Sequence, residues 1–427
     1  MAANDTSKNT GSQSPFANPW VQLVIGVICM AAVANLQYGW NLFVNPIEAK
    51  YHWGRAAIQV AFTLFVTLET WLIWVPGYMV DRHGPRGVVM IGGILVGLAW
   101  VLNSIASSLP LLYFAAALGG IGTGCVYGTC IGNALKWFPG RRGLAAGITA
   151  SGFGAGAVIT VGPIRTMIEA SGYEHAFLAF GLIQGGIVFV MSWLLFAPPR
   201  AIETAVVKPN QTAHGYTPIE VLQSPVFYVM YLMMVLVAFS GLTTLASMTP
   251  IAEEFKVTKV SVELFGMAMP ALAFALYLNR IFDGIGRPFC GWLSDQIGRE
   301  YTMALAFLVG AGALFTLSQS GTSPVLYVLV TPLYISMYGS IYSLFPATQG
   351  DTFGGKYAAA NNGMLYTAKG AGALLVPFAS ILMHSHGWNA VFMLGVTFNV
   401  LAALLALFVL KPMRARHFAK SRAAFET

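Results

Sequence analysis

Five ionisable side chains lie inside long apolar stretches of the sequence, where water cannot solvate them. They are Glu69, Arg280, Asp283, Arg287 and Lys369. An ionised side chain at the centre of a membrane-spanning helix costs about 2.5 to 3.5 kcal/mol, so such groups generally pair with another charge or bind a charged ligand. The sequence therefore contains the components of a site for a small ion, provided that its helices bring these groups together.

Arg287 and Lys369 lie far from the polar ends of their apolar stretches. Arg287 precedes Asp295 by eight residues, which is about 12 Å along a helix, and Lys369 follows Lys356 by thirteen residues, which is about 20 Å. A long side chain cannot reach the polar flank over such a distance by snorkelling. Both cations are therefore expected at the depth of a central cavity.

The composition identifies the surroundings of these charges as a lipid bilayer. Of 427 residues, 56% are hydrophobic and 9% are charged, whereas about a quarter of the residues in soluble domains are charged. This balance excludes a disordered chain, a nucleic-acid-binding domain and an ordinary cytosolic enzyme, although the net charge is +7. The four cysteines lie in apolar stretches, and neither a zinc-binding nor a nucleophile-elbow motif occurs. We expect no metal, no cofactor and no enzymatic activity.

Stretches of roughly 20 apolar residues, the length of a membrane-spanning helix, occur in two sets of six. The first set comprises residues 20–43, 57–80, 87–107, 110–134, 143–163 and 175–197. The second set comprises residues 225–250, 264–290, 301–320, 324–348, 357–384 and 388–410. We predict an all-α membrane protein of twelve transmembrane helices in two six-helix bundles, residues 20–200 and 225–410, with an N-terminal tail (1–19), a linker (201–224) and a C-terminal tail (411–427).

The distribution of the 23 Lys and Arg residues predicts the orientation of the chain. Segments on the side of the N-terminus hold fifteen of them, and three are the intramembrane Arg280, Arg287 and Lys369. The five on the opposite side are Lys50, Arg55, Arg165, Lys256 and Lys259. The positive-inside rule then places both termini in the cytoplasm. The N-terminus shows no cleavable signal. We expect a multi-pass, monomeric protein of the cell inner membrane without a nucleic-acid partner.

An internal repeat relates the two sets of apolar stretches. Gly77-Tyr-Met-Val-Asp81-Arg82-His-Gly84-Pro-Arg86 recurs 214 residues later as Gly291-Trp-Leu-Ser-Asp295-Gln-Ile-Gly298-Arg299-Glu300. Gly147, Gly154 and Gly156 recur at an offset of 216 as Gly363, Gly370 and Gly372. A six-helix unit used twice predicts a transporter with its site between the halves, near the middle of the membrane. The repeated glycines favour close helix packing, and the charges of the repeated loop, Asp81, Arg82, Arg86, Asp295 and Arg299, either hold a gate closed or serve packing alone.

The repeat also indicates that the two deep cations are not required by the fold. The matching positions of the first half hold Ile73 for Arg287 and Phe153 for Lys369. Two cations of the second half that face a first half without them indicate a binding site for an anion.

Internal salt bridges are the alternative. Arg287 would then pair with Asp283, one helical turn away, and Lys369 with Glu69. Arg280 is three residues from Asp283 and two turns from Arg287, so we expect it to pair with Asp283 or to support the site.

The repeated loop is similar to the signature loop of the major facilitator superfamily, and further segments resemble its oxalate/formate antiporter family over nearly the whole chain. These segments are Leu36-Gln-Tyr-Gly-Trp40-Asn-Leu-Phe43, Trp137-Phe-Pro-Gly-Arg-Arg-Gly-Leu-Ala-Ala-Gly147, Thr217-Pro-Ile-Glu-Val-Leu-Gln-Ser-Pro-Val-Phe-Tyr228, Gly286-Arg287-Pro-Phe, Leu344-Phe-Pro346 and Ala368-Lys369. The resemblance implies exchange of oxalate for formate, with Arg287 and Lys369 each engaging one carboxylate. It also implies a box around the anion formed by Gln37, Tyr38, Tyr127, Phe153, Tyr338, Tyr342 and Tyr366.

The chain departs from the family's pattern within this box. Tyr338 and Tyr366 stand where the oxalate-exchanging pattern has Trp, Phe153 where it has Tyr, and Glu69 where it has a neutral amide. These replacements keep the rings but change hydroxyls and charge, so a different small mono- or dicarboxylate also fits the pattern.

Alternating access with exchange is the leading hypothesis for the mechanism. Closing the two halves around two empty cations would cost about 5 to 7 kcal/mol, which a bound anion removes. A divalent anion exchanged for a monovalent one would move charge, so transport should respond to membrane potential.

Two other functions remain open at this point. One is proton-coupled uptake of a monocarboxylate such as lactate or pyruvate, with Glu69 or Asp283 as the proton site, because a desolvated carboxyl can titrate near neutrality. The other is a membrane sensor that binds a carboxylate without moving it, although the polar tails are too short to house a signalling domain.

Overall fold

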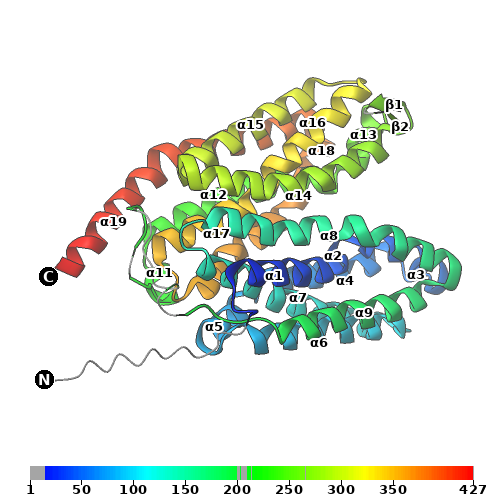
Figure 1. Cartoon of the computed structure of the whole chain (residues 1–427). Coiled ribbons are helices and arrows are strands. Elements are labelled where there is room, and N and C mark those ends of the chain that lie inside the picture. Colours follow the sequence, from blue (N-terminus) through cyan, green and yellow to red (C-terminus); the bar gives the residue numbers. More distant parts are fainter. Residues whose placement is uncertain (1–14, 200–201, 203–208, 213, 265, 427) are drawn as a thin grey trace, which may run out of the picture.

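The computed structural model describes residues 15–199, 202, 209–212, 214–264 and 266–426. Most of the predicted N-terminal tail (1–19) lies outside these residues, whereas most of the predicted linker (201–224) lies within them. The described chain is almost entirely helical and forms two helical bundles that lie side by side (Figure 1). The prediction of an all-α membrane fold is confirmed.

The first bundle comes from the first half of the sequence. Its helices are α1 (Pro19–Val33), α2 (Asn35–Tyr38), α3 (Trp40–Tyr51), α4 (Arg55–Trp71), α5 (Trp74–His83), α6 (Pro85–Ser104), α7 (Leu109–Trp137), α8 (Arg142–Ser171) and α9 (Tyr173–Ser192). Several starts follow directly from the sequence. Pro19 and Pro85 occupy the first helical position, where a missing N–H costs nothing. The side chain of Asn18 caps α1 by accepting a hydrogen bond from the Trp20 N–H at 2.9 Å.

The second bundle comes from the second half of the sequence. Its elements are α11 (Pro218–Leu222), α12 (Pro225–Ala246), α13 (Met248–Glu254), β1 (Ser261–Leu264), β2 (Met267–Pro270), α14 (Ala271–Ile297), α15 (Arg299–Gln319), α16 (Pro324–Gly339), α17 (Ile341–Phe353), α18 (Ala358–Leu404) and α19 (Lys411–Glu426). A π-helix, Leu405–Leu410, joins α18 to α19. The short strands pair antiparallel, with Ser261 opposite Pro270 and Leu264 opposite Met267.

Length and composition identify most of the predicted spans in the described residues. Nine helices there are long and apolar enough to cross a membrane, or ten if the bent pair α4 and α5 is one span. Helix α14 is not among them, because Arg280, Asp283 and Arg287 interrupt its apolar sequence. Helix α18 is two helices joined at Gly387, whose φ of 76° is not helical. The count of twelve spans therefore stays a prediction.

Two boundaries differ from the sequence-based expectation. The predicted span 264–290 begins only at Ala271, because the β1–β2 hairpin occupies the residues before it. The predicted C-terminal tail is helix α19, in which the Arg414 guanidinium bonds to Glu300 and donates to the Thr352 hydroxyl at 2.7 Å. A buried ion pair to α15 and a buried hydrogen bond to α17 thus hold α19 in place.

The described part of the linker is attached to the end of α17. The Thr212 N–H donates to the Asp351 carbonyl at 3.1 Å, and the Tyr216 N–H donates to the Phe353 carbonyl at 2.9 Å. A capping box then starts α11, because Thr217 and Glu220 satisfy each other's N–H groups. Hydrogen bonds from the Thr217 N–H and hydroxyl hold the pKa of Glu220 below its usual value.

Several spans are broken near the middle, at positions next to predicted site residues. Helices α4 and α5 meet at a bend of 42°, where Pro76 removes a hydrogen bond to the carbonyl of Leu72 and crowds it. The short helix α2, which carries Gln37 and Tyr38, lies between two breaks in the first span. The backbone therefore bends next to Glu69, and the first span is divided into shorter helices next to Tyr38.

The two bundles meet along two seams lined by the repeated glycines. In the first seam, α8 runs against α14, and a Cβ at Gly291 would lie 2.1 Å from the Gly143 carbonyl oxygen. In the second, α18 runs against α4 and α5, and a Cβ at Gly77 would lie 2.6 Å from the Ala359 carbonyl oxygen. The repeat relates the seams, since Gly77 matches Gly291. The prediction of glycine-mediated packing is confirmed.

The figure also shows which elements lie at each end of the molecule. Helices α5, α11 and α19 lie at one end, and α3, α13 and the hairpin lie at the other (Figure 1). Large apolar side chains such as Ile159 and Phe408 are exposed along the helices. Such side chains fit contact with lipid rather than water.

Candidate functional site

A cavity lies between the two halves and is lined by every side chain that the sequence predicts to bind substrate. These are Gln37 and Tyr38 on α2, Tyr127 on α7, Phe153 on α8, Arg287 on α14, Tyr338 on α16, Tyr342 on α17, and Tyr366 and Lys369 on α18. Arg280 and Asp283 line it as well, together with Leu242, Leu245 and Ile335, which sequence analysis missed because apolar residues of this kind occur on every helix. Rings and charges fill most of the space.

Arg287 is held by a forked ion pair and a carbonyl group. Its Nε donates to Asp283 Oδ1 at 3.0 Å and its Nη2 to Asp283 Oδ2 at 2.6 Å, while Nη1 donates to the Ala150 carbonyl of α8 at 2.8 Å. A Cβ at Gly154 would lie 2.9 Å from Asp283 Oδ2, and one at Gly339 would lie 2.1 Å from Oδ1. The two glycines make the space in which the carboxylate lies.

Lys369 is paired with a carboxylate from the other half. Its Nζ lies 3.3 Å from Glu69 Oε2 and 3.4 Å from Oε1, and it also donates to the Tyr366 hydroxyl at 3.0 Å. Glu69 is completely buried and Lys369 nearly so. Helix α18 approaches α4 closely enough for this contact because Gly370 packs on Thr70 and Trp71.

These contacts decide between the alternatives that the sequence left open. The expectation of two uncompensated cations is wrong, because Asp283 and Glu69 neutralise them in the described conformation. The expected pairing of Arg280 with Asp283 is not formed among the described residues. The Arg280 guanidinium instead lies over the ring of Tyr38, 4.3 Å from its centroid. The carboxylate of Asp283 is already held by the fork of Arg287, which explains this difference.

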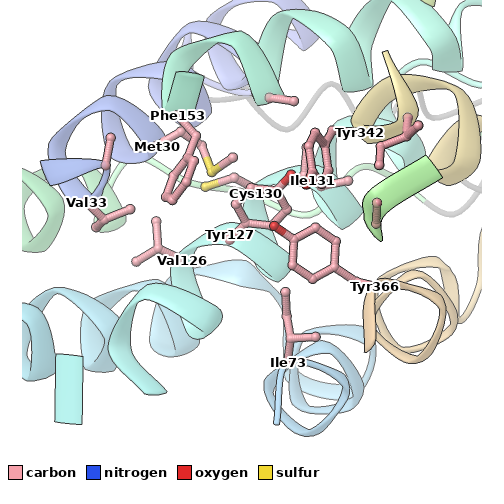
Figure 2. Packing of buried hydrophobic residues seen from close by; sticks show 14 of the residues in the cluster. Met30, Val33, Ile73, Val126, Tyr127, Cys130, Ile131, Phe153, Tyr342 and Tyr366 are labelled. Atoms are coloured by element: carbon pink, nitrogen blue, oxygen red, sulfur yellow. The ribbon is translucent and has the colours of Figure 1, made fainter. Parts of the chain in front are cut away.

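Aromatic rings from both halves surround the ion pairs. Figure 2 shows the rings of Phe153, Tyr127, Tyr366 and Tyr342 close to one another. They come from α8, α7, α18 and α17. The Tyr127 ring lies 5.3 Å from that of Phe153 and 4.7 Å from that of Tyr366, between centroids. The hydroxyls of Tyr338 and Tyr342 are hydrogen-bonded at 2.6 Å. The rings of this box form a compact apolar surface, and its hydroxyls can donate to a carboxylate.

Gln37 offers a further polar contact in the cavity. Its side-chain Oε1 is buried and has no hydrogen-bond partner among the described residues. A buried polar group without a partner is costly, which favours a ligand or water beside it.

Two carboxylates of the repeated loop cap helices of the opposite half. Asp295 accepts from the Gly143 N–H at 3.1 Å and the Leu144 N–H at 2.8 Å, at the start of α8. Asp81 accepts from the Ala359 N–H at 3.3 Å and the Ala360 N–H at 2.8 Å, at the start of α18. A carboxylate at a helix N-terminus is stabilised by the free N–H groups and the helix dipole. Both caps join the halves at the same end of the molecule.

Other charges of the repeated loop are divided between the seam and the surface. Arg299 bonds to Asp295 at 2.7 Å and to Asp351 at 2.8 Å, inside the seam. Arg82 and Arg86 are exposed and lie over the rings of Tyr78 and Phe196 instead. The gating role predicted for all five loop charges thus has a geometric basis for Asp81, Asp295 and Arg299 only.

Sequence analysis missed three further charged residues of the seams, which are Lys136, Arg142 and Asp351. Lys136 pairs with Asp81 at 2.8 Å, and Arg142 pairs with Asp351 at 2.9 Å. Both basic residues are among the fifteen Lys and Arg on the side of the N-terminus, where the positive-inside rule accounts for them as flanking charges of membrane spans. The signal that could identify them is the repeat, because Lys136 stands 215 residues before Asp351, as Phe138 does before Phe353.

The Asp295 cap should make a measurable contribution to closure of this end. Asp295→Asn removes the negative charge from the start of α8 and a partner from Arg299. We expect it to shift the equilibrium away from this closed conformation by about 5- to 30-fold, corresponding to about 1 to 2 kcal/mol. Alkylation of a Ser294→Cys reporter, buried in the seam, measures the shift. Asp81→Asn should act alike, and an unchanged rate in both variants would contradict the role.

Comparisons with known proteins agree with this architecture. The Major Facilitator Superfamily model matches residues 23–287 and 276–426. The oxalate:formate antiporter of Oxalobacter formigenes is 32% identical over 414 residues, covering 96% of this chain and 94% of that protein. The chain belongs to the oxalate/formate antiporter family of the major facilitator superfamily.

Members of this superfamily are transporters, and the chain is a multi-pass membrane transporter rather than an enzyme. The transporter FucP, in an outward conformation, superimposes with a TM-score of 0.70 at 15% identity, over 92% of this chain and 98% of that one. This likeness supports the superfamily fold. Human monocarboxylate transporter 11 is 29% identical over 157 residues, 36% of this chain and 33% of that protein.

Proposed function

We propose that the protein is a secondary transporter that exchanges small carboxylates, oxalate for formate, by alternating access. The observation that carries the proposal is the convergence of Arg287 and Lys369, from two helices of one half, on one cavity with the aromatic box. Two cations that line one compact box can each engage one carboxylate of a two-carbon dianion. The similarity to the oxalate:formate antiporter over nearly the whole chain supports this substrate class.

Substrate must displace the internal carboxylates in order to bind. Asp283 and Glu69 occupy the positions at the two cations that substrate oxygens would take. Arg287 keeps the Ala150 carbonyl and Lys369 keeps Tyr366, so each cation stays oriented during the replacement. The closed end is held by the Asp81 and Asp295 caps, and breaking these caps would let the halves rock about the cavity. We further propose that this end is cytoplasmic and that the protein lies in the cell inner membrane.

The ion pair between Glu69 and Lys369 favours one second candidate, a proton-coupled symporter of a small monocarboxylate. Because both cations are neutralised without substrate, crossing of the empty protein does not bury two free charges. The energetic argument for obligatory exchange is correspondingly weaker. The similarity to monocarboxylate transporter 11 over about a third of the chain points in the same direction.

Counterflow in proteoliposomes separates the two functions. Vesicles preloaded with unlabelled oxalate, formate, malonate, lactate or pyruvate receive labelled oxalate or formate outside. For an exchanger we expect rapid uptake into vesicles loaded with oxalate or formate and little uptake into empty ones. Uptake into empty vesicles with alkalinisation outside would instead establish symport. Equal uptake with every internal anion and with none would contradict the exchange proposal.

A further inference from the structure

The charges around the cavity do not balance, and their sum constrains what can be enclosed there. Arg280, Arg287 and Lys369 are positive, and Asp283 and Glu69 are negative. Among the described residues lining the cavity, together with Glu69 behind Lys369, one positive charge is therefore left over. Arg280 is half-buried, so water screens part of this charge. One bound negative charge balances the closed site, and two do not.

The two internal ion pairs differ in a way that matters for transport. Asp283 and Arg287 belong to the same helix, are joined by two hydrogen bonds, and move together. Glu69 belongs to α4 of the first half and Lys369 to α18 of the second, and their contacts of 3.3 and 3.4 Å are longer. Of these two pairs, only the Glu69–Lys369 pair must form and break as the halves separate. Glu69 is thus the carboxylate whose pairing depends on the position of the two halves.

We propose that the protonation state of Glu69 determines the charge of the substrate that the cavity binds. When Glu69 is ionised, the cavity binds a monocarboxylate. A dicarboxylate enters only together with one proton, which Glu69 accepts. The inference rests on the proposed carboxylate exchange and deepens it. The proton comes from water on the side to which the cavity is open and forms an O–H bond on Glu69. The ion pair with Lys369 breaks, and the ammonium turns to the second carboxylate of the substrate. On release at the other side, the proton returns to water.

The groups facing Glu69 are compatible with this role. Lys369 and Tyr366 approach it from α18, and Tyr127 of α7 packs against the Tyr366 ring. Arg287 of α14 also lines the cavity, over the same Tyr342 ring as Lys369, and already has its own carboxylate. The groups that would accompany a protonated Glu69 are hydroxyls, which can accept from its O–H.

This assignment changes the expected electrical behaviour of the exchange. A dianion moving with one proton carries the same charge as a monoanion, so exchange of oxalate for formate should carry no net charge and should respond to the pH gradient. Without the proton, each cycle would move one charge, and the accumulation ratio would change about 50-fold per 100 mV.

Proteoliposomes loaded with formate and given labelled oxalate test the proposal directly. The measured quantity is the ratio of labelled oxalate inside the vesicles to that outside. In the natural protein we expect this ratio to be independent of an imposed membrane potential and to change about tenfold per unit of pH gradient. In Glu69→Gln we expect the reverse: the ratio should depend on the membrane potential and should not depend on the pH gradient. Glu169→Gln, which removes an exposed carboxylate paired with Arg165, should behave as the natural protein. The proposal would be overturned if the ratio in the natural protein depended on membrane potential and not on the pH gradient. This outcome decides the matter even if the Glu69 variant does not fold.

A binding measurement distinguishes failure of this inference from failure of the proposed exchange. Thermal stabilisation of the purified protein by formate and by oxalate is compared between about pH 6 and pH 8, where both ligands are fully ionised. We expect oxalate affinity to rise about tenfold per unit of falling pH relative to formate. This result without transport would contradict exchange and support the role of Glu69. The role of Glu69 would be contradicted if the ratio of oxalate affinity to formate affinity did not change with pH, or if neither ligand stabilised the protein.

Discussion

Exchange of oxalate for formate should fall at least about 100-fold when Lys369 is replaced by glutamine, and equally when Arg287 is. In the proposed exchange, each substitution removes a cation that would engage a substrate carboxylate. It also leaves a buried carboxylate, Glu69 or Asp283, without its partner. Breaking one side of a buried ion pair costs about 3 to 5 kcal/mol, which alone corresponds to a factor of 100 or more. Initial rates of counterflow in proteoliposomes provide the measurement.

Matched double variants separate loss of binding from loss of stability. Glu69→Gln with Lys369→Gln, and Asp283→Asn with Arg287→Gln, remove both members of a pair and leave no unpaired charge. We expect each double variant to recover the thermal stability that its single variant loses, while exchange stays lost. Recovery of exchange in either double variant would mean that substrate binds elsewhere. Lys369→Arg adds a third comparison, because a planar guanidinium cannot replace a compact ammonium between Glu69 and Tyr366.

Closure of the end that carries the helix caps should be prevented by Gly291→Val. The backbones of α8 and α14 touch here, and even a Cβ would lie 2.1 Å from the Gly143 carbonyl oxygen. No rotamer can relieve a clash between a Cβ and a backbone oxygen, so the helices must separate. We expect the variant to populate the conformation open at this end and to exchange at less than about a hundredth of the normal rate, since each cycle requires closure.

The open state of this variant can be observed without transport. Alkylation of the Ser294→Cys reporter should become at least about tenfold faster in Gly291→Val, because Ser294 lies in the seam beside Gly143. Gly312→Val is the matched control. Gly312 lies on α15 with open space around it, so the same substitution there should leave both alkylation and exchange unchanged. Slow alkylation in Gly291→Val would show that the seam can absorb the added side chain.

Some features of the protein follow from the sequence alone because their physical causes are local. Long apolar stretches must form helices in lipid, since every backbone N–H and carbonyl then has a partner within the segment. The repeat identifies Gly77, Gly147 and their partners as packing positions, and they line the seams. The deep charges could also be singled out in advance, because a cation in an apolar span needs a polar environment. The residues of the aromatic box were named from the resemblance to the oxalate/formate antiporter family, and they line the cavity.

The pairing of the charges could be decided only by the tertiary structure. Glu69 and Lys369 are 300 residues apart, and nothing local to either indicates that α4 and α18 meet at Gly370. Asp283 has Arg280 and Arg287 within one turn on either side, and the space made by Gly154 and Gly339 positions it for Arg287. The sequence determined which groups must leave the lipid. The packing of the two halves determined which of them neutralise one another, because electrostatic energy depends on distances in space and not on separation along the chain.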